Sequence, residues 1–205
     1  MILGRQFAWA HMGKTAGDAT SKLFEVVGDL VLFSHDPADR RKHQTFREFG
    51  DEALEKELKV LNVRRLPSWK LSVVHHRSRH GTASDPTPIP IPSADVMVES
   101  LEADDMLLSF TDNGLISIDR WLRVESLRKD FIRFVSELRP LTEWEVLTLS
   151  TIETKVVAPY DRDFTKWFNA KQLRRLYKNN PPWAGIEKRI YGSLPASRWG
   201  VLSGD

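Results

Sequence analysis

The chain of 205 residues contains no cysteine, which excludes disulfides, a thiolate nucleophile and cysteine-ligated metal sites. Neither sign of charge is in marked excess, since 30 basic and 28 acidic residues leave a net charge of +2. This balance predicts no nucleic-acid partner. No apolar run approaches the length of a membrane span, and no secretory signal pattern opens the chain. We therefore expect a cytoplasmic protein without a membrane span.

The residues that are present are typical of a folded protein, with 41% apolar and 28% charged side chains. Length favours one domain over residues 1–205. Strand-like and helix-like segments alternate, which predicts an α/β fold of three layers, α/β/α, around a mostly parallel sheet. The expected strands are 5–11, 30–33, 58–63 and 115–124, and the expected helices are 17–27, 45–58 with a break near Gly50, 67–74, 94–110 and 127–138, with turns at 36–37 and 113–114.

A proline-rich segment covers residues 81–93, where every second position from 86 to 92 is proline. Alternate prolines favour an extended conformation and cannot all belong to a central strand. Long loops in compact domains are usually functional or disordered. We predict a flexible acceptor-side loop at 78–95, with a passive surface loop as the alternative.

The segment 7–20 carries the strongest functional signal. An apolar run ends in small residues around Lys14-Thr15, and a helix-like pattern follows through Leu23 and Val27. In a strand–loop–helix unit the loop N–H groups and the helix N-terminus point at one place, and a lysine adds a full charge. This order predicts a site for a phosphate-like group; the alternative, which the tripeptide Gly13-Lys14-Thr15 alone would favour, is a surface turn with a solvated lysine. The segment is not a Walker A loop, because Ala8 stands where that motif needs its first glycine.

Residues 11–20, His-Met-Gly-Lys-Thr-Ala-Gly-Asp-Ala-Thr, resemble the 5′-phosphosulfate loop of sulfotransferases that use 3′-phosphoadenosine 5′-phosphosulfate (PAPS). That loop commonly reads His-Ile-Pro-Lys-Thr-Gly-Gly-Thr-Ser. Asp18 departs from it, since a hydroxyl residue is usual there; Asp18 could cap the helix, touch the acceptor or mark a member without activity, and Thr20 could supply the hydroxyl. The resemblance implies that PAPS contacts Lys14, Thr15, Ala16, Gly17, Asp18, Ala19 and Thr20.

A second segment, residues 42–48, reads Lys-His-Gln-Thr-Phe-Arg-Glu and is similar to Lys-His-Ala-Thr-Ala-Arg-Glu in a broad subgroup of the family. It follows an expected strand, at the sheet edge where α/β proteins bind ligands. The resemblance implies that His43 is the general base, a role that suits a side chain titrating near neutral pH. A surface histidine at a helix start is the alternative.

A third segment, residues 63–72, reads Val-Arg-Arg-Leu-Pro-Ser-Trp-Lys-Leu-Ser and resembles the family's 3′-phosphate segment, Val-Arg-Asn-Pro-Tyr-Asp-Arg-Leu-Val-Ser. Arg64 and Ser72 keep the spacing of its arginine and serine, which implies that they bind the 3′-phosphate. Pro67 comes one position late, so a register that uses Arg65 remains open.

The resemblance as a whole implies a P-loop-like sulfotransferase fold. The implied reaction moves a sulfuryl group from PAPS to a hydroxyl or amine of a small-molecule or glycan acceptor, leaving 3′,5′-adenosine bisphosphate (PAP). Lys14 would stabilise the leaving phosphate, and no metal is expected. The alternatives are a small-molecule kinase that uses ATP and magnesium, and a non-catalytic nucleotide-binding protein of the same fold. Neither the acceptor nor the oligomeric state follows from the sequence.

Overall fold

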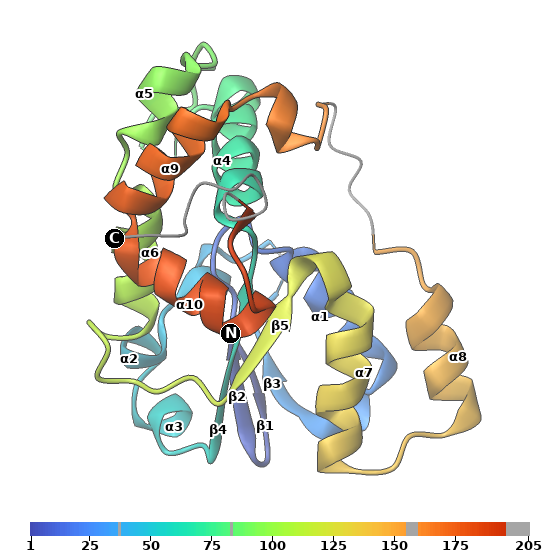
Figure 1. Cartoon of the computed structure of the whole chain (residues 1–205). Coiled ribbons are helices and arrows are strands. Elements are labelled where there is room, and N and C mark those ends of the chain that lie inside the picture. Colours follow the sequence, from blue (N-terminus) through green and yellow to red (C-terminus); the bar gives the residue numbers. More distant parts are fainter. Residues whose placement is uncertain (37, 83, 155–159, 196–205) are drawn as a thin grey trace. The chain divides into compact units, whose positions relative to one another are not determined.

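The computed structural model describes residues 1–36, 38–82, 84–154 and 160–195 (Figure 1). Pro37 of the predicted turn and Ala83 of the predicted loop lie outside them. By contact, the chain divides into two compact units, Met1–Val63 with Leu108–Val156 and Arg64–Leu107 with Val157–Asp205. Each unit is described by itself below.

The first unit contains a five-stranded sheet in the order β3-β1-β2-β4-β5. Its strands are β1 (Ile2–Gly4), β2 (Phe7–Ala10), β3 (Val31–Ser34), β4 (Leu58–Val63) and β5 (Arg120–Arg123). The pairs β2–β4 and β4–β5 are parallel, whereas β1 is antiparallel to both of its neighbours. Since β3 is therefore aligned with β2, β1 alone runs against the other four strands. The predicted α/β fold with a mostly parallel sheet is confirmed.

Two predicted strands are shorter in the structure. The expected strand 5–11 is β2 alone, because Arg5 and Gln6 form the exposed turn that joins it to β1, a strand the sequence analysis did not expect. The expected strand 115–124 begins only at Arg120. Residues 112–114 all have positive φ, and the N–H of Ile116 donates to the carbonyl of Thr111. The apolar residues after Gly114 suggested a strand, but the backbone of residues 111–116 forms a turn.

The helices of the first unit largely follow the predicted pattern. They are α1 (Gly17–Val26), α2 (Phe46–Phe49), α3 (Asp51–Leu54), α7 (Leu127–Leu138) and α8 (Glu143–Thr151), with short 3-10 turns η1 (Gly28–Leu30), η2 (Arg40–His43) and η3 (Val124–Ser126). The break predicted near Gly50 separates α2 from α3, where Gly50 has φ 101°. The sequence analysis did not predict α8.

The core of the first unit lies between one sheet face and the helices α1, α7 and α8. Phe7 and Trp9 of β2 point into it, and Phe24 of α1 and Phe131 of α7 meet them there. The alternate β2 residues Ala8 and Ala10 are fully buried on the opposite face. Burial of both faces explains why β2 reads as a continuous apolar run.

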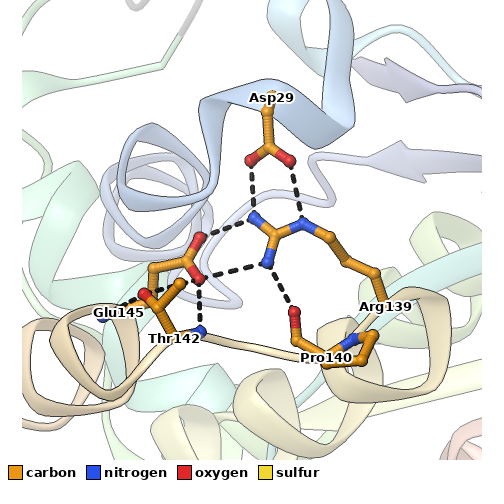
Figure 2. Close-up of polar contacts among 5 residues, drawn as sticks. All are labelled: Asp29, Arg139, Pro140, Thr142 and Glu145. Carbon is orange, nitrogen blue, oxygen red and sulfur yellow. Dashed lines mark hydrogen bonds and ion pairs between the residues drawn. The ribbon is translucent and has the colours of Figure 1, made fainter.

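One ion-pair cluster ties α8 to the turn η1 (Figure 2). Arg139 donates to Asp29 at 2.6 and 2.8 Å and to Glu145 at 2.5 and 3.1 Å. Glu145 also accepts from the backbone N–H and the hydroxyl of Thr142, which completes a capping box at the start of α8. The Arg139 hydrogen bonds, with those from Thr142, lower the pKa of Glu145 to about 2.

We expect Arg139→Met to lower the free energy of unfolding by roughly 1–3 kcal/mol at neutral pH, because the Glu145 carboxylate stays buried without its cation. A carboxylate with a depressed pKa stabilises the folded protein at pH values above its ordinary pKa of 4.5. This contribution to the free energy of unfolding is lost as the pH falls toward 2. The difference between wild type and variant should therefore shrink over that range in urea unfolding. Arg120→Met is the control, since its pair with Glu137 is 44% and 40% exposed and should contribute less than about 1 kcal/mol. Equal losses in both variants would contradict the prediction.

The second unit is helical. Its helices are α4 (Leu66–His80), α5 (Ala94–Val98), the larger part of α6 (Glu102–Phe110), α9 (Ala170–Asn179) and α10 (Pro181–Tyr191), with the 3-10 turn η4 (Phe164–Lys166). In Figure 1, α5 lies beside α9. Trp69 of α4 packs on Trp183 of α10, with ring centroids 5.1 Å apart. Asp104 of α6 accepts a hydrogen bond from the backbone N–H of Trp183 at the start of α10.

The predicted loop at 78–95 is shorter in the structure. Ser78–His80 form the last turn of α4, and α5 begins at Ala94. No helix or strand occurs in its described part, residues 81–82 and 84–93. Gly81 has φ 66°, and a Cβ there would overlap the backbone of residues 85–87, so the chain turns sharply back on itself at α4's end.

Candidate functional site

The candidate site lies at the carboxyl ends of β2 and β4. From β2 the chain passes through α1 to β3, which lies on one side of β2 in the sheet. From β4 the chain continues to β5, which lies on the opposite side of the sheet. The ends of β2 and β4 are thus the point at which strand order reverses, where open α/β sheets bind their ligands. The loop of residues 11–16 follows β2 at this edge and leads into α1. We call it the anion loop.

The anion loop has an unusual backbone. Lys14 and Ala16 adopt φ values of 64° and 62°, a left-handed region that non-glycine residues occupy at a cost of about 1–3 kcal/mol each. Alternation of right- and left-handed residues is the backbone arrangement in which successive N–H groups can turn toward one side and form a concave anion-binding surface. The loop conformation predicted from the sequence as strand, tight loop and helix is therefore present.

The second feature of this sheet edge is the N-terminus of α1. Ala16 is its N-cap residue, and no side chain caps the first helical N–H groups. The N–H groups of Gly17, Asp18 and Ala19 have no acceptor within the helix, whereas that of Thr20 donates to the Ala16 carbonyl. Three donors and the positive end of the helix dipole thus lie together.

Thr15 of the anion loop and Thr20 of α1 use their hydroxyls within the protein. Thr15 is fully buried and donates to the carbonyl of Met12 at 2.6 Å. Thr20 is equally buried, donates to the Ala16 carbonyl and accepts from Asn62. Their side chains shape the loop, so any contact of Thr15 with a ligand would come from its backbone. Thr20 is therefore a poor substitute for the hydroxyl missing at position 18.

Asp18 does not cap α1. Its carboxylate accepts from the ammonium of Lys42 at 2.9 Å, on the segment that carries His43. Burial opposes ionisation of Asp18, but the hydrogen bond from Lys42 and the charge of that lysine lower the pKa of Asp18 overall. The carboxylate is therefore charged and matched by a lysine. An aspartate would repel an anion bound nearby, and the pairing with Lys42 offsets that repulsion.

His11 and His43 lie against each other, with ring centroids 4.3 Å apart. Nδ1 of His43 is 3.0 Å from the carbonyl oxygen of His11. A carbonyl only accepts, so Nδ1 carries the proton and Nε2 of a neutral His43 holds the lone pair. His43 is exposed overall, but desolvation of its ring and the Lys42 charge lower its pKa. Burial lowers the pKa of His11 to about 3. Both rings are neutral at physiological pH.

Gly17 is required by the close approach of His11. A Cβ at position 17 would overlap the His11 ring, which is 95% buried between Trp9 and His43. We expect Gly17→Ala to lower the free energy of unfolding by roughly 1–3 kcal/mol, although alanine is normally better than glycine in a helix. Urea unfolding tests this. The control is Gly28→Ala, because no atom lies within 4 Å of a Cβ built there. Equal effects of the two substitutions would refute the steric explanation.

The predicted residues Arg64 and Ser72 belong to the second unit. Both are half-buried; Arg64 precedes α4, and Ser72 lies within it. Arg65 donates to Glu187 at 3.0 Å, and its guanidinium carbon lies 4.0 Å from the centre of the Tyr191 ring. Burial raises the pKa of Glu187 to about 7, against the hydrogen bonds that it accepts from Leu66, Arg65 and Tyr177. Arg65 therefore has a structural role, which favours the register that uses Arg64.

The sequence analysis missed Asn62, a fully buried residue of β4 whose amide reaches the anion loop. A signal was available. Asn62 is a polar residue on an apolar strand, and alternation from Val60 places it on the face that packs against α1.

Among the described residues, no group of three or more histidines and carboxylates is arranged to hold a metal ion. No helix in the same part of the chain is long and apolar enough to cross a membrane.

Comparison with known proteins adds no relative. No family model matches the chain, and neither the curated proteins nor the solved structures contain a significant match. The sulfotransferase resemblance therefore stays a prediction from the motifs.

Proposed function

We propose that this protein is a PAPS-dependent sulfotransferase with a P-loop-like fold. The observation that carries the proposal is the anion loop, where a neutral histidine and an uncapped helix N-terminus lie at one sheet edge. The N–H groups of residues 17–19 would donate to the oxygens of a phosphosulfate. Three further features are consistent with the proposal: the left-handed residues of the loop, the parallel pair β2–β4 and the matched charge of Asp18.

The proposed roles follow from charge and protonation. PAPS supplies an activated sulfuryl group, and the bond between sulfur and the phosphate oxygen breaks as a new sulfur–oxygen or sulfur–nitrogen bond forms to the acceptor. Lys14, which is half-buried in the loop, neutralises the charge that develops on the leaving phosphate. Nε2 of His43 takes the proton of the acceptor hydroxyl or amine. Arg64 and Ser72 are expected to bind the 3′-phosphate, the group that separates PAPS from ATP.

A thermal-shift experiment tests the proposal against its two alternatives. PAP at about a hundredfold its dissociation constant should add roughly 2.7 kcal/mol to the folded state, which is easily measured as a rise in Tm. ATP with magnesium should give a smaller shift. The opposite order would favour a small-molecule kinase. Stabilisation by PAP without sulfated product, over a broad panel of hydroxyl and amine acceptors, would favour a non-catalytic nucleotide-binding protein.

A further inference from the structure

Asn62 joins three parts of the first unit beneath the anion loop. Its side-chain oxygen accepts from Nε1 of Trp9 at 2.9 Å. An indole only donates, so this bond fixes which end of the amide is oxygen. The amide nitrogen then donates to the Thr15 carbonyl at 2.7 Å and to the Thr20 hydroxyl at 2.6 Å. The oxygen contacts the sheet, and both nitrogen protons are directed to the loop and to α1.

The bond to Thr15 acts at the most constrained part of the loop. Thr15 lies between Lys14 and Ala16, the two residues with left-handed backbone. An unconstrained loop would relax from such a conformation, so it needs contacts that hold it. The bond to Thr20 fixes the first turn of α1 to the same amide. One buried side chain thus holds the loop and the helix N-terminus in register.

We propose that Asn62 is a positioning residue that holds the anion loop in its binding conformation before the ligand arrives. The inference rests on the proposed function, and it deepens it: Asn62 determines donor affinity without touching the donor. If the loop relaxes in the absence of Asn62, the apparent dissociation constant rises by the reciprocal of the fraction that remains competent.

The test uses Asn62→Asp in the full chain. Aspartate keeps the size and the oxygen that faces Trp9, but it removes both donors and sets an acceptor against the Thr15 carbonyl. The Kd for PAP, measured by calorimetry below each variant's Tm, should rise at least tenfold, and so should the KM for PAPS. The kcat at saturating PAPS should stay within about threefold, because the bound donor restores the loop. Asn62→Ser is a second variant, to be used if the aspartate variant does not fold. Serine is neutral and too short to reach both the Thr15 carbonyl and the Thr20 hydroxyl, so the Kd for PAP should rise similarly.

Trp9→Phe is the matched control. It removes the hydrogen bond to the same amide on the sheet side and leaves both loop bonds intact. It should lower the Tm while the Kd for PAP stays within about twofold. If the Asn62 variants also lose stability but bind PAP as tightly as wild type, Asn62 is only a core residue and the inference is overturned.

Inorganic pyrophosphate separates this inference from the proposed function. If wild type binds pyrophosphate but not PAP, the sulfotransferase proposal fails, and Asn62 is then judged by whether Asn62→Ser raises the pyrophosphate Kd at least tenfold. An unchanged pyrophosphate Kd would overturn the positioning role. Absence of binding to either anion by wild type would overturn both proposals.

Discussion

Replacing Lys14 with alanine should reduce sulfuryl transfer by roughly a hundredfold or more, because the developing charge on the leaving phosphate loses its cation. Lys14 adopts φ 64° in the anion loop. Alanine in that conformation is no more strained than lysine. We therefore expect a loss of turnover with a near-normal Tm. Transfer of radiolabelled sulfate from PAPS to an acceptor measures it.

Lys22→Ala is the control for this experiment. Lys22 is an exposed lysine of α1, so the substitution removes the same charge within a few residues of the loop. Its turnover should stay close to that of wild type. A Lys14→Ala variant that sulfates normally, or a Lys22→Ala variant that loses as much, would remove Lys14 from the mechanism.

Replacing His43 with asparagine should lower kcat by about 10²- to 10⁴-fold, the usual contribution of a general base. The asparagine amide nitrogen can take the place of Nδ1 and keep the hydrogen bond to the His11 carbonyl. What the variant lacks is Nε2, the atom proposed to accept the proton. The Kd for PAP should therefore change by less than about twofold. A normal kcat would mean that His43 only packs against His11.

The pH profile of the wild type gives an independent check on His43. A base acts in its neutral form, and desolvation lowers the pKa of His43 below its ordinary value of 6.5. The acid limb of kcat/KM, which reports the free enzyme, should thus have its midpoint below 6.5, so that activity extends to more acidic pH than an unperturbed histidine would allow. The limb should disappear in the residual activity of His43→Asn. A midpoint above 6.5 would argue against His43 as the base.

Local sequence was sufficient for much of the architecture. The helix α7 begins and ends where the spacing of its apolar residues predicts, and β4 follows its apolar run. Both patterns record which side of a segment is buried, and that information lies within a few residues. The strand, loop and helix around Lys14-Thr15 were also predictable, because the apolar run before the loop and the helical spacing after it are local patterns. The identification of β1 failed, since three apolar residues before Arg5 carry no sign of where a strand would pair.

Only the tertiary structure decided how the site is held together. Asp18 pairs with Lys42, which is 24 positions away in sequence, and Asn62 reaches Thr15 across 47 positions. Gly17 is needed because the His11 ring lies against it, a contact that its position in a helix does not suggest. By itself the sequence determined the residue types and the local conformations, since these depend on neighbours along the chain. Which polar groups meet depends on strand order and register, and those arise when the sheet and its helices pack.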